Sequence, residues 1–199
     1  MGVKAESVKE LRAATGAGIL DCKTALEESG GDFDKAVEYL KKKNRATAVK
    51  KQSRDAKEGQ VSTYVHGDGR IGVMIEINSE TDFVARSDPF TEFTREMCLQ
   101  VAAMAPLAVD HDDLDPEMVA KQKEIFEAQM EGQKKPPEII EKIITGKLNK
   151  WYKEVCLLDQ AYIRDDSKSV RDLLTEVIGK CGENIRVRRF ARYELGEGL

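Results

Sequence analysis

The 199-residue sequence is poor in the residues from which metal sites and catalytic triads are built. It has 2 histidines, His66 and His111, and 4 cysteines scattered at positions 22, 98, 156 and 181 with no CxxC pair. A zinc site normally requires closely spaced cysteines and histidines. We therefore expect no metal site. Scattered thiols in an untargeted chain favour reduced cysteines, with a single disulfide or intersubunit bridge as the alternative.

Long apolar runs and an excess of basic charge are also missing. No apolar run approaches the roughly 20 residues that cross a bilayer, and charged residues interrupt the first 20 residues, where a signal peptide needs an unbroken apolar stretch. The 32 basic and 36 acidic side chains give a net charge of −4, whereas nucleic-acid-binding proteins are typically basic. We expect a cytoplasmic protein that contacts neither a membrane nor nucleic acid directly.

Common catalytic motifs are absent as well. The chain contains no GxSxG, GxxxxGK[ST], GxGxxG or HExxH pattern, and these patterns serve hydrolases, nucleotide-binding enzymes and metalloproteases. The paired acids at 112–113 and 165–166 lie in polar stretches, where solvated loops explain them better than acid–base catalysis. The sequence predicts no catalytic residues, no cofactor and no enzymatic activity.

Hydrophobic spacing predicts three short helices at the N-terminus. Glycines 16 and 18 end the first helix, and Ser29-Gly30-Gly31 ends the second. Asp32 is a favourable N-cap for a third helix, whose apolar face comprises Phe33, Ala36, Val37 and Leu40. Helices this short are marginally stable alone, so we expect them to share one small core.

The composition changes between Lys41 and Lys57, where eight basic residues face a single acid, Asp55. This stretch can be a solvated helical linker or a contact for an anionic partner, and the charge pattern leaves both interpretations open. We place a domain boundary here. It separates a helical domain with its basic linker, residues 1–55, from a second domain, residues 56–199.

The second domain begins with strand-like alternation. Apolar residues alternate over 61–65 and 71–77, on either side of the hairpin signal Gly67-Asp68-Gly69. We expect these apolar positions, including Val61 and Val65, to face helices. A third strand is predicted over 185–193, and helices over 90–104, 119–130, 140–155 and 170–178. The fold class is α+β, with a small three-stranded antiparallel sheet packed on helices.

Two groups of residues on or near these strands invite a functional interpretation. A solvated strand face usually shows fewer large apolar side chains than the three predicted here, Tyr64, Met74 and Phe190. Scattered exposed apolar residues are nevertheless also ordinary. Asp82 and Phe83 place a carboxylate beside an aromatic ring on a strand-to-helix loop. The ring can insert into a neighbouring protein, or it can plug this protein's own core, which spacing alone favours.

Four segments resemble the elongation factor Ts family. Residues 11–26 and 76–86 carry the longest similarities, and residues 146–152 and 183–190 are also similar. The resemblance covers essentially the whole chain. It implies a ubiquitin-associated-like fold for the three N-terminal helices. It also implies that the protein acts as a guanine-nucleotide exchange factor for the GTPase elongation factor Tu.

The resemblance assigns roles to particular residues. Docking on the GTPase is expected of Arg12, Thr15, Gly16, Ala17, Gly18 and Ile19. A wedge that disturbs the GTPase's magnesium and phosphate site is expected of Thr81, Asp82, Phe83 and Val84. This role reverses the expectation that Phe83 fills the core.

The chain is also expected to differ from longer members of that family. Those carry a duplicated core and an inserted helical hairpin, whereas this chain is expected to have a single core, which is associated with homodimers. Tyr64, Met74 and Phe190 are then the expected dimer face. Two rival functions are a ubiquitin-associated-like adaptor that only binds, and an RNA-binding accessory protein that uses the basic stretch and Arg186 to Arg192.

Overall fold

The computed structural model describes residues 3–132 and 136–198. The chain divides into two compact units. One comprises Met1–Val61, Glu76–Arg95 and Asp172–Val187, and the other comprises Ser62–Ile75, Glu96–Arg171 and Arg188–Leu199. The sequence-based boundary between residues 55 and 56 stays a prediction. Within the described residues, none of the helices has the length and apolar character needed to cross a membrane.

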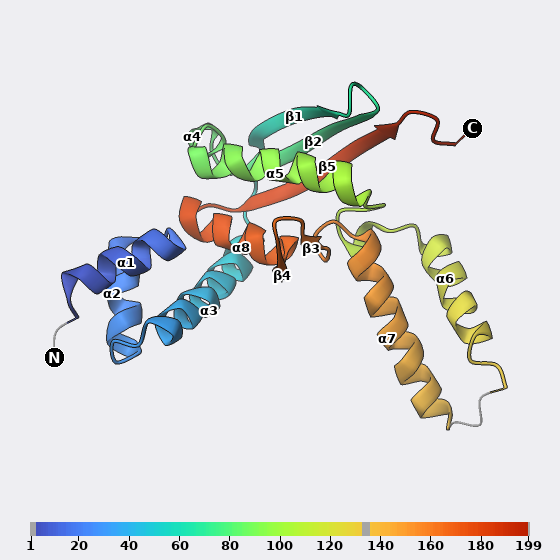
Figure 1. Cartoon of the computed structure of the whole chain (residues 1–199), viewed down its shortest axis with the longest axis horizontal. Coiled ribbons are helices and arrows are strands. Elements are labelled where there is room, and N and C mark those ends of the chain that lie inside the picture. Colours follow the sequence, from blue (N-terminus) through green and yellow to red (C-terminus); the bar gives the residue numbers. More distant parts are fainter. Residues whose placement is uncertain (1–2, 133–135, 199) are drawn as a thin grey trace. The chain divides into compact units, whose positions relative to one another are not determined.

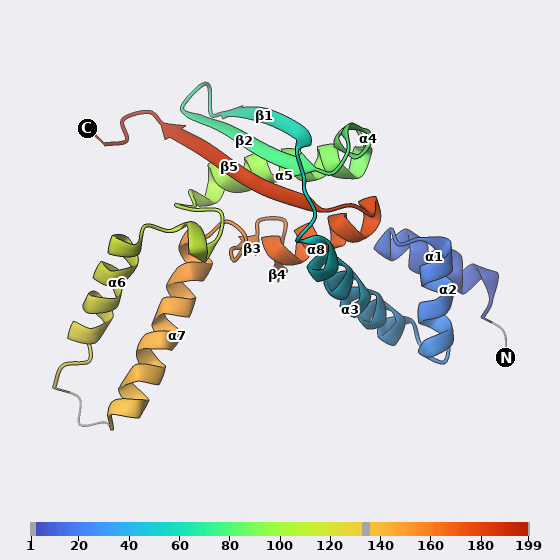
Figure 2. The ribbon, with the colours of Figure 1, turned by 180° about the vertical axis from the view of Figure 1, so that it is seen from behind.

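A three-stranded antiparallel sheet has residues in both units. Its strands are β1 (Glu58–His66), β2 (Ile71–Ser79) and β5 (Ile185–Glu194), in the order β1-β2-β5. Helix α5 (Asp88–Met104) runs along the sheet (Figures 1 and 2). The predicted α+β class, with a small antiparallel sheet packed on helices, is confirmed.

Alternation along the strands shows which side chains are open to solvent. In β2, Val73, Ile75 and Ile77 are buried, whereas Met74 is 53% exposed. In β1, Val61 and Val65 are 63% and 65% exposed, so the prediction that they face helices is wrong. Four residues separate the two strands, and this spacing places odd-numbered β1 residues opposite even-numbered β2 residues. The valines therefore share the open side with Met74.

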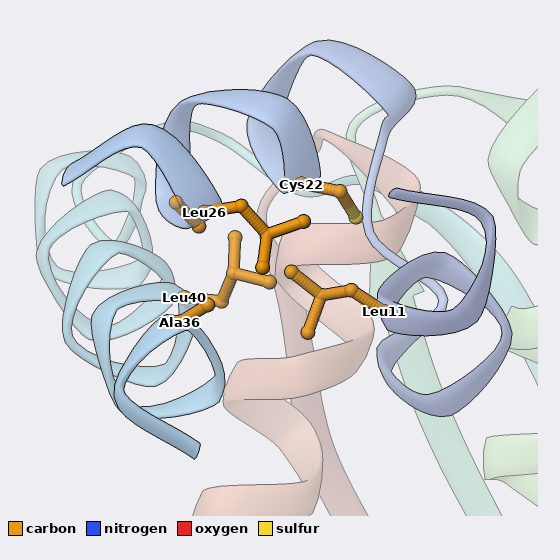
Figure 3. Packing of buried hydrophobic residues seen from close by; sticks show 6 residues of the cluster. Leu11, Cys22, Leu26, Ala36 and Leu40 are labelled. Carbon is orange, nitrogen blue, oxygen red and sulfur yellow. The ribbon is translucent and has the colours of Figure 1, made fainter. Parts of the chain in front are cut away.

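The first unit begins with the three expected helices, α1 (Ala5–Thr15), α2 (Ile19–Glu28) and α3 (Phe33–Lys51). Figure 3 shows the shared core that was predicted from their spacing, with side chains from all three helices pointing toward one another. Its buried members are Leu11, Cys22, Ala25, Leu26, Ala36 and Leu40. The side chain of Asp32 caps α3 by accepting a hydrogen bond from the Lys35 N–H (3.1 Å).

The basic stretch continues α3 through Lys51 and is largely used inside the first unit. Lys43 pairs with Asp21 of α2 (2.6 Å). Arg45 pairs with Asp172 of helix α8 (Val170–Cys181; 2.8 Å). Lys51 donates a hydrogen bond to the Gly182 carbonyl. Several of these cations therefore dock α3 on its neighbours, a role that neither sequence interpretation included, and fewer remain for an anionic partner.

The second unit contains a helical hairpin that the sequence analysis did not anticipate. Helices α6 (Pro116–Ala128) and α7 (Pro137–Val155) lie side by side in both views (Figures 1 and 2). Lys147 of α7 donates to the Gln129 side-chain oxygen (2.6 Å) and lies over the Phe126 ring. The expectation that the chain lacks such a hairpin is therefore wrong. The sequence predicted each helix but not their pairing.

The rest of the second unit is compact and irregular. A short 3₁₀ helix, η1 (His111–Asp113), precedes α6. Strands β3 (Ala161–Tyr162) and β4 (Asp165–Ser169) form a two-stranded antiparallel sheet, so the acid pair predicted to lie in a loop begins a strand instead. Polar residues such as Asp165 and Asp166 at strand positions leave no apolar alternation to detect.

Candidate partner-contacting surface

The wedge residues form a single helical turn after β2. Helix α4 spans Asp82–Ala85, and Thr81 is its N-cap, with Oγ1 accepting a hydrogen bond from the Val84 N–H (3.4 Å). Asp82 lies in the first turn, where a carboxylate is favourable near the helix N-terminus. It forms an ion pair with Arg86 one turn later (2.9 Å).

Phe83 is the most exposed of the large apolar side chains in the described part of the chain. It is 82% exposed, whereas Ala85 is buried and Val84 is half-buried. The alternative that Phe83 plugs the protein's own core is therefore wrong. A large aromatic side chain is rarely left this open, and burying it in a partner would contribute roughly 1.5–3 kcal/mol.

The backbone around this turn is fixed by the neighbouring Ser87 and by two side chains from distant parts of the sequence, Gln60 and Glu183. Gln60 of β1 donates to the Ala85 carbonyl (2.7 Å), and Ser87 Oγ donates to the Val84 carbonyl (2.7 Å). Thr81 is held in turn by the carboxylate of Glu183. A one-turn helix has few hydrogen bonds of its own, so these contacts determine how Phe83 is presented.

The second predicted contact is the turn between α1 and α2. Gly16 ends α1 in the left-handed conformation (φ +67°), and its N–H donates to the Arg12 carbonyl (2.8 Å). Thr15 Oγ1 donates to the Leu11 carbonyl (2.7 Å) and accepts from the Ala17 N–H (3.3 Å). The turn is therefore a defined structure, with Thr15 and Ala17 half-buried and the Arg12 side chain exposed.

Gly18, unlike Gly16, does not have a positive φ that favours glycine. Its φ of −61° suits any residue, and a Cβ built there would meet nothing closer than Asp21 Oδ2 at 3.6 Å. Nothing within the chain therefore demands a glycine at this position. The missing side chain leaves the surface open to close approach by another molecule.

Two large apolar residues follow this turn in the open. Ile19 is 57% exposed and Leu20 is 78% exposed, although both belong to α2. Sequence reasoning included Ile19 among the contact residues but missed Leu20. The available signal was its position, because Leu20 lies outside the Cys22, Ala25 and Leu26 stripe that enters the core.

The predicted dimer-face residues all belong to the second unit. Met74 is exposed, while Tyr64 and Phe190 are half-buried. The prediction that Tyr64 and Met74 share one face is wrong, because the four-residue turn puts the even-numbered residues of the two strands on opposite sides of the sheet. The Tyr64 hydroxyl is hydrogen-bonded to His66 Nδ1 (2.8 Å). Near the ends of β1 and β5, Val65 and Tyr193 are more exposed than either, and sequence reasoning did not include them.

One group of side chains in the described residues has the composition of a cation site. Asp110, His111 and Asp159 bring one ligand atom each to within 4.8 Å of the others. The Arg171 guanidinium already joins the two carboxylates, at 2.8 Å from each. Burial alone would raise the pKa of Asp110, but the hydrogen bonds and charge of Arg171, together with the His111 N–H and the charge of His111, outweigh it and lower that pKa. The cluster is therefore explained as an ion-pair network.

Comparison of the sequence with known proteins shows which family the chain belongs to. The family model described as "Elongation factor TS" matches residues 34–197. This chain belongs to the elongation factor Ts family. It is 56% identical over 198 residues to elongation factor Ts of Thermotoga petrophila, covering 100% of this chain and 98% of that protein.

Two further relatives support the same assignment. Elongation factor Ts of Anaeromyxobacter sp. (strain Fw109-5) is 55% identical, covering 99% of this chain and 90% of that protein. Elongation factor Ts of Caldanaerobacter subterraneus subsp. tengcongensis is 52% identical, covering 99% and 98%. The Thr15–Ile19 turn precedes the residues that the family model matches, but these near-full-length similarities extend over it. Membership identifies the chain as a translation elongation factor.

Proposed function

We propose that this chain is a guanine-nucleotide exchange factor for elongation factor Tu and acts in the cytoplasm without catalysing a covalent step. The observation that carries the proposal is the presentation of Phe83, a solvent-exposed ring on a helical turn whose backbone is fixed by Gln60, Ser87 and Glu183. An unconstrained loop could also expose a ring, but it would lose conformational entropy when it docked.

The exchange reaction then follows from thermodynamic linkage. A GTPase holds GDP through backbone amides of its phosphate loop and a bound Mg²⁺. We infer that Phe83 enters an apolar gap of the GTPase while Asp82 displaces polar groups near the magnesium and phosphate site. If this complex is stable only with those contacts distorted, the factor weakens GDP binding as much as GDP weakens binding of the factor.

The α1–α2 turn supplies a second contact in this proposal. Arg12, Thr15, Gly16, Ala17, Gly18 and Ile19 dock on the GTPase, and the exposed Leu20 extends their apolar surface. Gly18 permits close approach of the partner's backbone because no side chain projects there. Arg12 contributes a charged side chain at the edge of this surface, where charge mainly affects the rate of association.

The experiment is stopped-flow release of fluorescent GDP from elongation factor Tu. The wild-type chain is expected to accelerate release strongly, and Phe83→Ala should remove most of the acceleration while leaving the fold intact. Val49→Ala is the matched control, because Val49 is also an exposed apolar residue of the first unit but lies outside both contacts. Binding without acceleration would instead establish the adaptor function.

We also propose that the chain forms a homodimer through the open side of its strands. Met74 is central, Val65 and Tyr193 add exposed apolar area, and Phe190 contributes its accessible part. Tyr64 is not included, because the strand register turns it to the side opposite Met74. Sedimentation at micromolar concentration should give twice the chain mass for the wild type and the chain mass for Met74→Glu. A strictly monomeric wild type would overturn this proposal without affecting the exchange reaction.

A further inference from the structure

The loop that carries the wedge is bound to a segment one hundred residues further along the chain. The Glu183 carboxylate accepts two hydrogen bonds from Thr81, one from the backbone N–H (3.0 Å, to Oε2) and one from Oγ1 (2.8 Å, to Oε1). Thr81 is also the N-cap of α4. Both carboxylate oxygens of Glu183 are therefore used to fix the residue from which the wedge helix starts.

The neighbouring residues repeat this connection in the reverse direction. The Asn184 N–H donates to Glu80 Oε1 (2.6 Å), and the Asn184 side chain donates to the Arg54 carbonyl (2.8 Å). Arg54 in turn lies 3.5 Å from the Glu80 carboxylate. Glu80 and Thr81 are thus paired with Asn184 and Glu183, the two residues that precede β5. Such reciprocal charge-assisted hydrogen bonds restrict both segments.

The same corner of the chain also contacts the N-terminal helices. The Lys180 side chain lies so close to Gly16 that a Cβ there would be 2.7 Å from Lys180 Cε. A Cβ on Gly179 would lie 2.6 Å from the Asn44 side-chain oxygen. Residues 179–184, here called the α8 corner, therefore contact the docking turn, helix α3 and the wedge loop, and all of these segments belong to the first unit.

We propose that Glu183 is a positioning residue for nucleotide exchange, which holds the Asp82–Phe83 wedge at a fixed place relative to the docking turn. The proposal rests on the exchange function given above. Phe83 is too exposed for packing to orient it, and the four residues of α4 cannot sustain a helix alone. The orientation of the ring therefore depends on the anchor at Thr81, and binding of the turn places that anchored ring at the nucleotide site.

The test compares Glu183→Ala with the wild type in the GDP-release assay over a range of factor concentrations. The maximal release rate should fall about tenfold, which corresponds to about 1.4 kcal/mol. The half-saturating concentration should change less than about threefold, because the docking turn still binds. The milder Glu183→Gln should lie between the two. Glu38→Ala, which removes an exposed carboxylate from α3, should behave as the wild type.

A double-mutant cycle separates positioning from general destabilisation. When Phe83→Ala is already present, Glu183→Ala should change the release rate less than about twofold, since there is no ring left to position. Hydrogen exchange of the free chain gives a readout that needs no GTPase. Glu183→Ala should accelerate exchange of the Thr81 amide and leave the amides of α1 and α2 unchanged.

The outcomes distinguish the two proposals. If the wild type accelerates GDP release and Glu183→Ala matches it, the positioning role is wrong and the exchange function stands. An equal loss from Glu183→Ala in the wild-type and Phe83→Ala backgrounds also overturns positioning, because the effect would not pass through the ring. If the wild type fails to accelerate release, the exchange function is wrong and the role of Glu183 in it falls as well.

Discussion

The packing of the three N-terminal helices can be tested with the same substitution at two leucines. Leu11 is fully buried in the shared core, and Leu20, nine residues later, is 78% exposed. Leu11→Ala removes three carbon atoms from the core, and at about 0.8 kcal/mol for each buried carbon the transfer cost is about 2.4 kcal/mol. The remaining cavity increases the total to roughly 3–4 kcal/mol.

Leu20→Ala removes the same atoms from the surface, so its effect on the free energy of unfolding should stay within about 0.5 kcal/mol. Denaturant unfolding followed by circular dichroism gives the stabilities, and hydrogen exchange over residues 5–28 locates the loss. We expect Leu11→Ala to accelerate exchange throughout α1 and α2. Leu20→Ala should instead weaken GTPase binding at unchanged stability.

The control for this pair is Leu148→Ala, a half-buried leucine of α7 in the second unit. It should leave exchange over residues 5–28 unchanged. Equal destabilisation by Leu11→Ala and Leu20→Ala would refute the assignment of one leucine to the core and the other to the partner-contacting surface.

Three further predictions concern particular side chains. The pKa of Asp110 is lowered in the folded state. The ionised carboxylate therefore stabilises the fold fully above its ordinary pKa of about 3.8, and this stabilisation is lost as the pH falls through the lowered pKa of the folded state. In thermal unfolding between pH 2 and 6, the melting temperature of Asp110→Asn should fall less steeply with decreasing pH than that of the wild type. Burial raises the pKa of Cys98 and Cys156 to about 11, so at pH 8 only about one such thiol in a thousand is ionised, and mass spectrometry should find both alkylated only after denaturation. Gly16→Ala should lower the free energy of unfolding by about 1–2 kcal/mol because of its positive φ, whereas Gly18→Ala should leave stability unchanged and weaken GTPase binding in a titration.

Local sequence patterns predicted much of the fold. Glycines at 16 and 30–31, the cap at Asp32 and the apolar stripe of α8 indicated where helices begin, end and pack. These signals act within a few residues, so they can be read without tertiary structure. The side of the sheet on which Val61 and Val65 lie was misassigned. The turn includes Arg70, a residue with no turn signature, and one extra turn residue exchanges the two faces of a strand.

The candidate site was less predictable because its supports are distant in sequence. Spacing alone favoured a buried Phe83, and only the resemblance to the elongation factor Ts family indicated an exposed one. The contacts of Thr81 with Glu183 and of Glu80 with Asn184 join residues more than one hundred positions apart. No periodicity relates such residues. The use of Arg45 and Lys51 to dock α3 was hidden in the same way, since a charge run has the same composition whether or not its partners are internal.

The reciprocity of binding tests the proposed exchange mechanism most directly. Calorimetry or fluorescence would give the dissociation constant of GDP for elongation factor Tu with and without a saturating concentration of this chain, and the dissociation constant of the chain with and without GDP. The account predicts that GDP and this chain each raise the dissociation constant of the other by the same large factor. Phe83→Ala should bring both factors toward one. Equal affinity of the chain for the GDP-bound and nucleotide-free GTPase would contradict it.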